Sequence, residues 1–407
     1  MRISTLSIYG NATNQLNTLQ SALARTQMQL STNRRILTPA DDPVASARAL
    51  EVSQSREMNS QFATNRASAR SSLSAVEGAL QNAGDLLQDI QRLTVNAGNG
   101  SMLPSDRKAL ATELEGRLAD LLGVANSTDG AGGYLFSGYM ATTQPFTRTP
   151  EGAGYNGDQG QRQLQVGASR KIPLSASGSA VFENNLTGNG TFQTQAADDN
   201  AGGAIISPGS VVNRGLAEGR KSYTLTFATD ASTPPVTTYT VVDEAGDPVP
   251  GHDAAVYEAG KAISFGGITF DIKGEPAAGD EFTIAPSTKQ SIFTTVTDLI
   301  AALKAPADGT AGKAALTNRL NTALDNLSQA HDNVLTVQAS VGAHMKELDY
   351  LDSAGDDLDI QYAATLGDLQ DLDAVKAISE FSQQQTTLQA AQMSFKTMSG
   401  LSLFNYL

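Results

Sequence analysis

The side chains best suited to chemistry are few and widely spaced in this sequence. The three histidines, His252, His331 and His344, fall in no HExxH pattern and no comparable ligand spacing, which disfavours a catalytic metal site. Cysteine is absent, and its absence excludes a disulfide framework, a thiolate zinc site and a cysteine nucleophile. No paired carboxylates or nucleophile and base can be singled out by spacing. We therefore expect no enzyme activity, no catalytic residue, no cofactor and no metal.

Three local motifs resemble ligand loops but lack the context that such loops need. The glycine-rich residues 130–138 follow a predicted helix instead of preceding one, so they predict a helix-to-strand turn and not a phosphate loop. The acidic residues at 356–359 lack the spacing and the glycine of a calcium loop, and residues 312–313 lack the rest of a nucleotide-binding P-loop. These motifs are interpreted as structural.

Charge and hydropathy exclude two further classes of protein. The net charge of −14 repels phosphate backbones, so a nucleic-acid partner is disfavoured. No apolar run approaches the roughly 18 residues that a membrane span requires, and the first thirty residues lack the apolar block of a secretory signal. We expect neither membrane insertion nor secretion by a signal peptide.

Glycine and proline divide the chain of 407 residues into three parts. Residues 150–290 hold 20 of the 37 glycines and nine of the 14 prolines, whereas the flanks are rich in Ala, Leu, Gln and Ser. Within the middle part, residues 223–227 and 268–272 alternate polar and apolar side chains as strands do, and residues 243–250 are rich in turn formers. The chain therefore reads as helix, then antiparallel sheet, then helix.

The N-terminal flank carries a seven-residue hydrophobic row and then a break. The row is typical of a coiled-coil seam and consists of Tyr9, Leu16, Leu23, Leu30 and Leu37. Residues 38–43 contain two prolines that end this helix, after which Asp42 suits an N-cap. Periodic apolar residues then predict helices over 73–90 and from about 105 to 125, which together form an antiparallel hairpin.

The C-terminal flank predicts one very long helix and a second seam. A heptad row with one interruption runs through Leu320, Leu327, Val334, Val341, Leu348, Tyr362 and Leu369, with His344 in the companion row. An unbroken helix over 316–372 would be on the order of 80 Å long, which predicts an elongated molecule. The phase slips past Leu372, and Phe381, Leu388 and Phe395 form a new row beside Met398.

Charge differs in sign between the two flanks. Residues 1–70 hold eight arginines, no lysine and four acids, whereas residues 347–380 hold ten acids and one lysine. The simpler interpretation is a solvated helix face. Alternatively, the two flanks lie side by side, either within one chain or between neighbouring subunits.

Several stretches of the sequence resemble bacterial flagellins and flagellin-like hook-associated proteins. Residues 29–36 (QLSTNRRI) and 39–45 (PADDPVA) are similar to the N-terminal signature of this superfamily. Residues 133–138, 155–162, 279–284 and the ending 401–407 are similar to the hook-associated protein 3 family, which forms the hook–filament junction. Residues 186–222 match no family pattern and are interpreted as an insertion or a variable loop.

The resemblance implies a fold and a route. We expect an α+β, flagellin-like fold: an elongated rod of long N- and C-terminal helices in a coiled-coil bundle, with an inserted antiparallel β domain. The resemblance further implies export through the flagellar type III apparatus with the help of an export chaperone. The exported copies would assemble in a ring between hook-associated protein 1 on the proximal side and flagellin on the distal side. The expected location is extracellular, after a transient cytoplasmic stage.

Five regions follow from these patterns. We expect an N-terminal coiled-coil arm over 1–40, the first half of a helical rod over 41–150, an outer β-rich domain over 151–286, the second half of the rod over 287–360 and a C-terminal arm over 361–407. The residues expected at the subunit interface are apolar and lie in the two arms: Tyr9, Leu16, Leu23, Leu30, Leu37, Phe381, Leu388, Phe395, Met398, Leu401, Phe404 and Leu407.

Two other functions remain open from the sequence. Filament flagellin itself is the nearest alternative, since the N-terminal signature is shared. A carbohydrate-binding or adhesive module in the β region is the alternative from a different class, although tryptophan is absent and no aromatic platform is visible.

Overall fold

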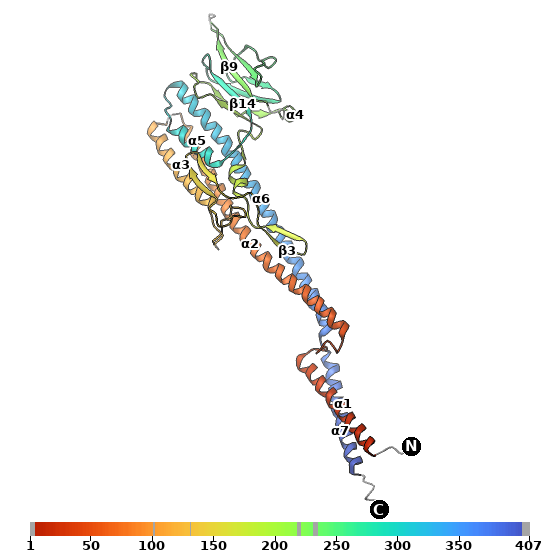
Figure 1. Ribbon diagram of the computed structural model, residues 1–407. Coiled ribbons are helices and arrows are strands. Elements are labelled where there is room, and N and C mark those ends of the chain that lie inside the picture. The colour runs from red at the N-terminus through yellow and green to blue at the C-terminus, as the bar shows by residue number, and fades with distance from the viewer. Residues whose placement is uncertain (1–4, 101, 131, 218–220, 231–234, 401–407) are drawn as a thin grey trace, which may run out of the picture. The chain divides into compact units, whose positions relative to one another are not determined.

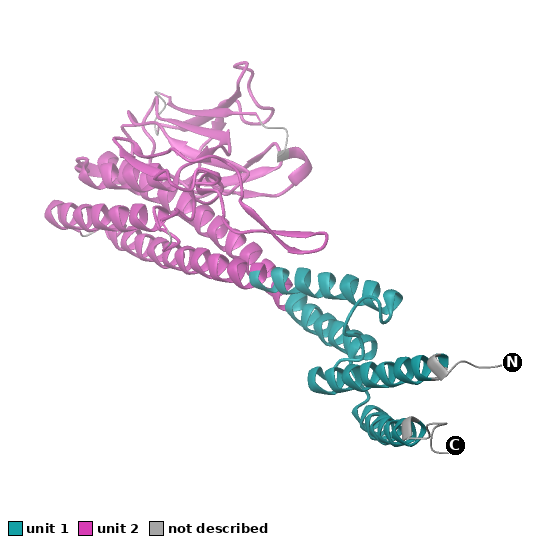
Figure 2. Ribbon diagram, turned by 60° about the horizontal axis from the view of Figure 1, so that its bottom comes forward, with its two compact units in different colours: residues 1–64, 350–407 teal, residues 65–349 magenta. Residues whose placement is uncertain are grey.

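The structure is a computed structural model that describes residues 5–100, 102–130, 132–217, 221–230 and 235–400. The chain divides into two compact units (Figure 2). Unit 1 comprises residues 1–64 and 350–407, and unit 2 comprises residues 65–349. Unit 1 is helical, whereas unit 2 contains helices and all of the strands.

Six of the seven α-helices in the described part of the chain lie in its two flanks, and the short α4 (Arg214–Ala217) lies in the β-rich middle (Figure 1). The six helices of the flanks are α1 (Thr5–Thr32), α2 (Pro43–Ala97), α3 (Pro104–Ala125), α5 (Ile292–Lys304), α6 (Gly309–Gln370) and α7 (Ala374–Gly400). A short π-helix spans Ser179–Glu183. The long helix predicted over 316–372 and the break after it are confirmed in α6 and α7.

Within unit 2, α2 and α6 run antiparallel with their heptads in register. Side-chain contacts join Ser74 to Met345, Gln81 to Gln338 and Gln88 to His331, so each step along the pair covers seven residues of both helices. The apolar row beside these contacts is buried and consists of Leu73, Leu80 and Leu87 on α2 and of Leu327, Val334, Val341 and Leu348 on α6. The heptad seam predicted for this part of the chain therefore forms a core.

Fifteen short strands form five antiparallel sheets in the described part of unit 2. The strands are β1 (Phe146–Thr149), β2 (Gly152–Tyr155), β3 (Gln163–Gly167), β4 (Arg170–Pro173), β5 (Asn185–Leu186), β6 (Phe192–Ala196), β7 (Ile205–Ile206), β8 (Ser210–Val211), β9 (Tyr223–Thr229), β10 (Thr237–Asp243), β11 (Ala255–Val256), β12 (Ala262–Phe265), β13 (Ile268–Lys273), β14 (Glu281–Pro286) and β15 (Lys289–Gln290). The largest sheet has the order β11-β10-β9-β14-β6, and a second has the order β12-β13-β7, with β8 also paired to β13.

One hydrophobic core joins these two sheets. It contains Leu225, Phe227, Val241, Phe282 and Ile284 from the larger sheet and Ile263, Phe265, Phe270 and Ile272 from the smaller one. The stretch 186–222, which matches no family pattern, contributes β6, β7 and β8 to the sheets and Phe192 and Ile206 to the core. Its interpretation as a loop is therefore wrong, because its apolar residues complete the packing of the β domain, whereas its interpretation as an insertion stays a prediction.

Three asparagines of α6 hold the β region against that helix. Asn318 accepts a hydrogen bond from Ile206 N and donates one to Ala204 O, and Asn333 donates to Ala180 O and Val181 O. Asn326 accepts from Gly188 N. Because these amides satisfy main-chain groups that no sheet partner reaches, they fix where the chain segments meet the helix.

Candidate functional site

The two terminal helices form an antiparallel pair within unit 1. The rings of Tyr9 on α1 and Phe395 on α7 meet edge to face, with centroids 5.9 Å apart and an interplanar angle of 88°. Further along, Thr26 Oγ1 donates a hydrogen bond of 3.0 Å to Gln384 Oε1. Tyr9 and Phe395 of the two predicted seams therefore meet within a single chain, whereas Leu37 lies beyond the end of α1, which comes at Thr32, before the prolines that were expected to end it.

This pair buries few of the residues that were predicted for the subunit interface. Leu388 is buried, with 9% of its surface exposed, whereas Tyr9 and Met398 are 37% and 44% exposed. The other predicted residues that the structure describes are half-buried: Leu16, Leu23, Leu30, Leu37, Phe381 and Phe395. Leu401, Phe404 and Leu407 lie outside the described residues. That these side chains contact other subunits stays a prediction.

Unit 1 as a whole has almost no apolar interior. The hydrophobic residues buried in its described part are Ala45, Ala49, Ala377 and Leu388, and only the last is larger than alanine. By contrast, eight of the thirteen residues of α5 in unit 2 are buried. A helix keeps its structure in water chiefly by packing an apolar face, so the unit 1 helices lack their usual source of stability.

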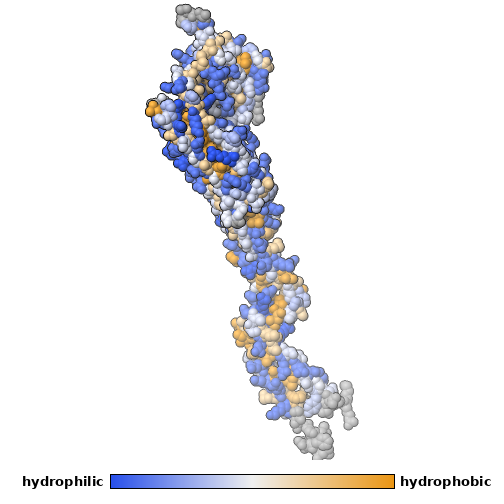
Figure 3. All heavy atoms as spheres, turned by 60° about the vertical axis from the view of Figure 1, so that its left-hand side comes forward, coloured by the Kyte–Doolittle hydropathy of each residue, from blue (hydrophilic) through white to orange (hydrophobic). Residues whose placement is uncertain are grey.

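Large hydrophobic side chains instead reach the surface of unit 1. Twelve of the 22 that are exposed among the described residues belong to this smaller unit, and patches of hydrophobic colour are visible on the surface in Figure 3. Examples are Val44, Leu50 and Met58 on α2 and Tyr350 and Ile360 on α6. The sequence analysis missed these positions because they lie off the heptad row, and their unusual exposure is visible only in the structure.

The break between α1 and α2 is joined to the break between α6 and α7. The main chains of Arg34 and Asp371 pair as an isolated antiparallel β-bridge. Arg35 N donates to Gln370 O at 2.8 Å, and Leu372 N donates to Asn33 O at 3.3 Å. The φ of Asn33 is +54°, a left-handed conformation that asparagine tolerates better than most residues. The guanidinium of Arg35 also donates to Leu369 O at 2.7 Å. Main-chain bonds thus tie the two breaks together.

Two aspartates build the turn in the 39–45 motif. Asp41 Oδ2 accepts hydrogen bonds of 2.9 Å from the main-chain N–H groups of Leu37 and Thr38, which lower its pKa, and Arg25 lowers it further. Asp42 Oδ1 accepts a hydrogen bond from Ala45 N at 3.0 Å, which lowers the pKa of Asp42. The Asp42 side chain therefore caps α2 as predicted, so this part of the signature is explained by helix-start chemistry.

Opposite charges of the two flanks pair within the chain. Arg56 and Asp359 form an ion pair of 2.8 Å in unit 1, and the hydrogen bond from Arg56 lowers the pKa of Asp359. Arg70 and Asp349 form a similar pair of 2.8 Å in unit 2. Both pairs join α2 to α6, so the side-by-side interpretation of the charge pattern holds within one chain at these positions. Such exposed pairs favour register more than stability.

The described residues contain no grouping suited to metal chemistry. No cluster of three or more His, Cys, Asp or Glu residues in this part of the chain is arranged to hold a metal ion. His252 lies between Tyr239 and Ser264 O, and His331 contacts Gln88. His344, in the companion row of α6, is half-buried, with Nδ1 3.9 Å from Glu347. None of the described helices combines the length and apolar character that crossing a bilayer requires.

Comparison with known proteins agrees with the helical signature and extends it to the whole chain. The family described as the bacterial flagellin N-terminal helical region matches residues 3–141. Flagellar hook-associated protein 3 of Escherichia coli K12 is 29% identical over 405 residues, which is 99% of both chains.

Solved structures extend the similarity to the fold. The crystal structure of flagellar hook associated protein-3 from Legionella pneumophila has a TM-score of 0.74 and 34% identity, covering 78% of this chain and 98% of that one. The flagellar junction protein FlgL from the same organism gives 0.72 and 34%, covering 80% and 100%. Both the predicted fold and the predicted family are confirmed. The chain belongs to the flagellar hook-associated protein 3 family, and it is a structural, non-enzymatic protein of the flagellum.

Proposed function

We propose that this chain is the structural adaptor between the flagellar hook and the filament, and that its terminal helices gain stable order when several copies assemble. Relatives named for the hook and for the flagellar junction match it over nearly their whole length, which supports the position in the flagellum. The coupled ordering rests on one observation. In the terminal pair, the buried side chains among those described are Thr26, Ala377 and Leu388.

Half-buried seams explain why assembly would stabilise the arms. Two helices can cover only one face of each other, so the leucines and phenylalanines of the heptad rows keep part of their surface in water. A third helix from a neighbouring copy would cover that surface, at about 25 cal/mol for each Å² of apolar area removed from water. We assign the arms, residues 1–40 and 361–407, to an inner coiled-coil layer made by several copies.

The remaining regions follow the same scheme. Residues 41–150 and 287–360 form the helical rod around the α2–α6 seam, and residues 151–286 form an outer domain. The β domain has a hydrophobic core of its own, made by its two larger sheets, and this supports the last assignment. Several copies of the chain form a ring, with hook-associated protein 1 on the proximal side and flagellin on the distal side.

Export precedes assembly in this proposal. The chain leaves the cytoplasm through the flagellar type III apparatus and functions outside the cell. An export chaperone binds the C-terminal arm beforehand. The sparse core of the terminal pair supports such a route, since little packing has to be lost when the arms are kept unfolded.

Hydrogen exchange tests the coupled ordering directly. In dilute, monomeric full-length chain, we expect the amides of α1 and α7 to exchange much faster than those of α5, which is densely buried. In isolated hook–filament junctions the same amides become protected. Equal protection of α1, α7 and α5 in the solitary chain would show that the arms are complete without partners.

Truncation and substitution test the assembly in cells. A chain without residues 388–407 is expected to be excluded from the flagellum, and Leu23→Ala or Phe395→Ala reduces incorporation. Leu216→Ala serves as a control, because Leu216 is 62% exposed and lies in the β domain. Normal incorporation of the truncated chain contradicts the proposal.

The same strains distinguish a junction protein from filament flagellin. A strain that lacks this chain is expected to make flagellin, to secrete it as monomers and to build no filament. If flagellin-type protein disappears altogether, the chain is the filament subunit instead.

A further inference from the structure

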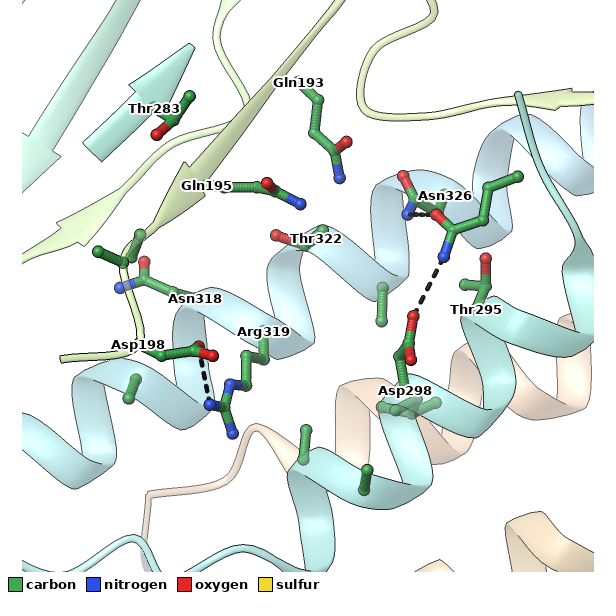
Figure 4. Close-up of a pocket in the computed structure, with 18 residues that line it drawn as sticks. Gln193, Gln195, Asp198, Thr283, Thr295, Asp298, Asn318, Arg319, Thr322 and Asn326 are labelled. Carbon is green, nitrogen blue, oxygen red and sulfur yellow. Dashed lines mark hydrogen bonds and ion pairs between the residues drawn. The ribbon is translucent and has the colours of Figure 1, made fainter. Parts of the chain in front are cut away.

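A polar cleft lies in unit 2 between the β domain and two helices (Figure 4). Strands β6 and β14 form one wall, α5 and α6 form the other, and the volume is about 650 Å³. This volume falls within the range of about 300–1,000 Å³ that small-ligand sites occupy. Gln193 and Gln195 point into the cleft from β6, where they alternate with Phe192 and Thr194, which are buried.

A directed chain of hydrogen bonds ends at a carboxylate in this cleft. Gly188 N donates to Asn326 Oδ1 at 2.7 Å, Asn326 Nδ2 donates to Gln290 Oε1 at 3.1 Å, and Gln290 Nε2 donates to Asp298 Oδ2 at 3.1 Å. Asn326 is only 5% exposed. Because each amide is bonded at both ends, Gln290 and Asp298 are held in one orientation before any ligand arrives.

The other oxygen of Asp298 has no donor. Among the residues that the structure describes, no hydrogen bond reaches Oδ1 and no cation pairs with this carboxylate. Desolvation raises the pKa of Asp298 and the hydrogen bond from Gln290 lowers it, and the residue stays exposed at the cleft. The cleft's arginine, Arg319, pairs instead with Asp198 at 2.8 Å, and that aspartate side chain is 84% exposed. Oδ1 of Asp298 is therefore an acceptor without a donor among the described residues.

The surrounding side chains add neutral acceptors. The amides of Gln193 and Gln195 and the hydroxyl of Thr322 line the cleft and make no hydrogen bond to any described residue. None of the lining residues is aromatic, so the cleft lacks the stacking platform on which sugar rings are usually held. An anionic ligand would meet the carboxylate of Asp298.

We propose that this cleft binds a cationic group with several N–H donors, the guanidinium or ammonium of an arginine or lysine side chain. The charged group donates to Asp298 Oδ1, and its remaining N–H groups donate to the side-chain carbonyls of Gln193 and Gln195. A charge-assisted hydrogen bond is stronger than a neutral one. The inference is independent of the proposed role at the junction, because it rests on the cleft alone.

Calorimetric titration of the full-length chain tests the proposal. The probes are the blocked tripeptides Ala-Arg-Ala and Ala-Gln-Ala, spermidine, and maltotriose. We expect saturable binding of Ala-Arg-Ala and about tenfold weaker binding to the Asp298→Asn variant, the effect of losing one charged hydrogen-bond acceptor. Asp332→Asn is the matched control. It removes the same charge from an exposed site on α6 outside the cleft, and its affinity should equal that of the wild type.

A second variant keeps the proposal testable if Asp298→Asn does not fold. Thr322→Lys places an ammonium inside the cleft and is expected to abolish binding of Ala-Arg-Ala, with circular dichroism unchanged. Binding of spermidine that depends on Asp298 supports the same site with a free polyamine as its source. Equal affinity in Asp298→Asn, tighter binding of Ala-Gln-Ala or of maltotriose, or no saturable heat at millimolar ligand would each overturn the proposal.

Discussion

Asp325 is predicted to destabilise the folded chain at neutral pH. It lies on α6 in unit 2, partly buried, and no described residue forms a hydrogen bond or an ion pair with its carboxylate. Burial raises the pKa of Asp325 from 3.8 to about 6. Ionising Asp325 therefore costs more free energy in the native state than in the unfolded state. Asp325→Asn, which carries no charge at any pH, removes that cost.

The size and sign of the effect follow from linkage. A shift from 3.8 to about 6 is roughly two pKa units, and each unit corresponds to about 1.36 kcal/mol, so the ceiling is about 3 kcal/mol. Water reaches part of the carboxylate, and we therefore expect about 1–2 kcal/mol. Between pH 4 and 6 the native state binds more protons than the unfolded state, so this group's contribution to stability falls as the pH rises. The loss is complete above about pH 7.

Urea unfolding at pH 4.5, 6 and 8, followed by circular dichroism, measures this contribution. The stability gained by Asp325→Asn over the wild type should be small at pH 4.5 and largest at pH 8. Asp332→Asn removes one negative charge from an exposed position on the same helix and controls for the net charge of −14. If the two variants respond alike to pH, desolvation of Asp325 is not the cause and the reasoning is refuted.

Two further substitutions probe contacts in unit 2. Asn333→Ala leaves main-chain acceptors of Ala180 and Val181 without a donor, and urea unfolding should show a loss of about 1–3 kcal/mol. An unchanged midpoint would mean that water replaces the amide. Gly138 has a φ of +70°, and a Cβ atom added there would clash with Asp158, so Gly138→Ala should lower the free energy of unfolding by more than about 1 kcal/mol. Thermal unfolding of this variant at the wild-type temperature would show that the 133–138 turn can move.

The spacing of apolar residues and the positions of proline and aspartate predicted the helical part of the fold well. The row from Leu320 to Leu348 is buried along α6 as its seven-residue spacing indicated, and α3 begins at Pro104, next to the predicted start. Proline and aspartate chemistry also placed the start of α2. These features depend on local sequence, because a seam or a cap is set by residues within one or two turns.

Features that depend on distant partners escaped the sequence analysis. The pairing of residues 33–35 with 370–372 has no sequence signal, because single hydrogen bonds join two breaks far apart in the chain. Strands of two residues, such as β7 and β11, are defined only by the strands they pair with. In the cleft, Gln193 and Gln195 do show the alternation of a strand, but nothing in their spacing indicates that Asp298 lies opposite.

The same heptad pattern produces a core in one unit and half-exposed rows in the other, and this difference carries functional information. In unit 2 the row of α6 is sealed by α2 and by neighbouring elements, so Leu327 and Leu348 are fully buried. In unit 1 the continuation of that row, Tyr362 and Leu369, stays half-buried, as do the seams of α1 and α7. Since apolar spacing of this kind contributes stability only when it is covered, the pattern in unit 1 supports the proposed packing against surfaces of other copies. Copies of the chain that lie side by side are the simplest source of such surfaces.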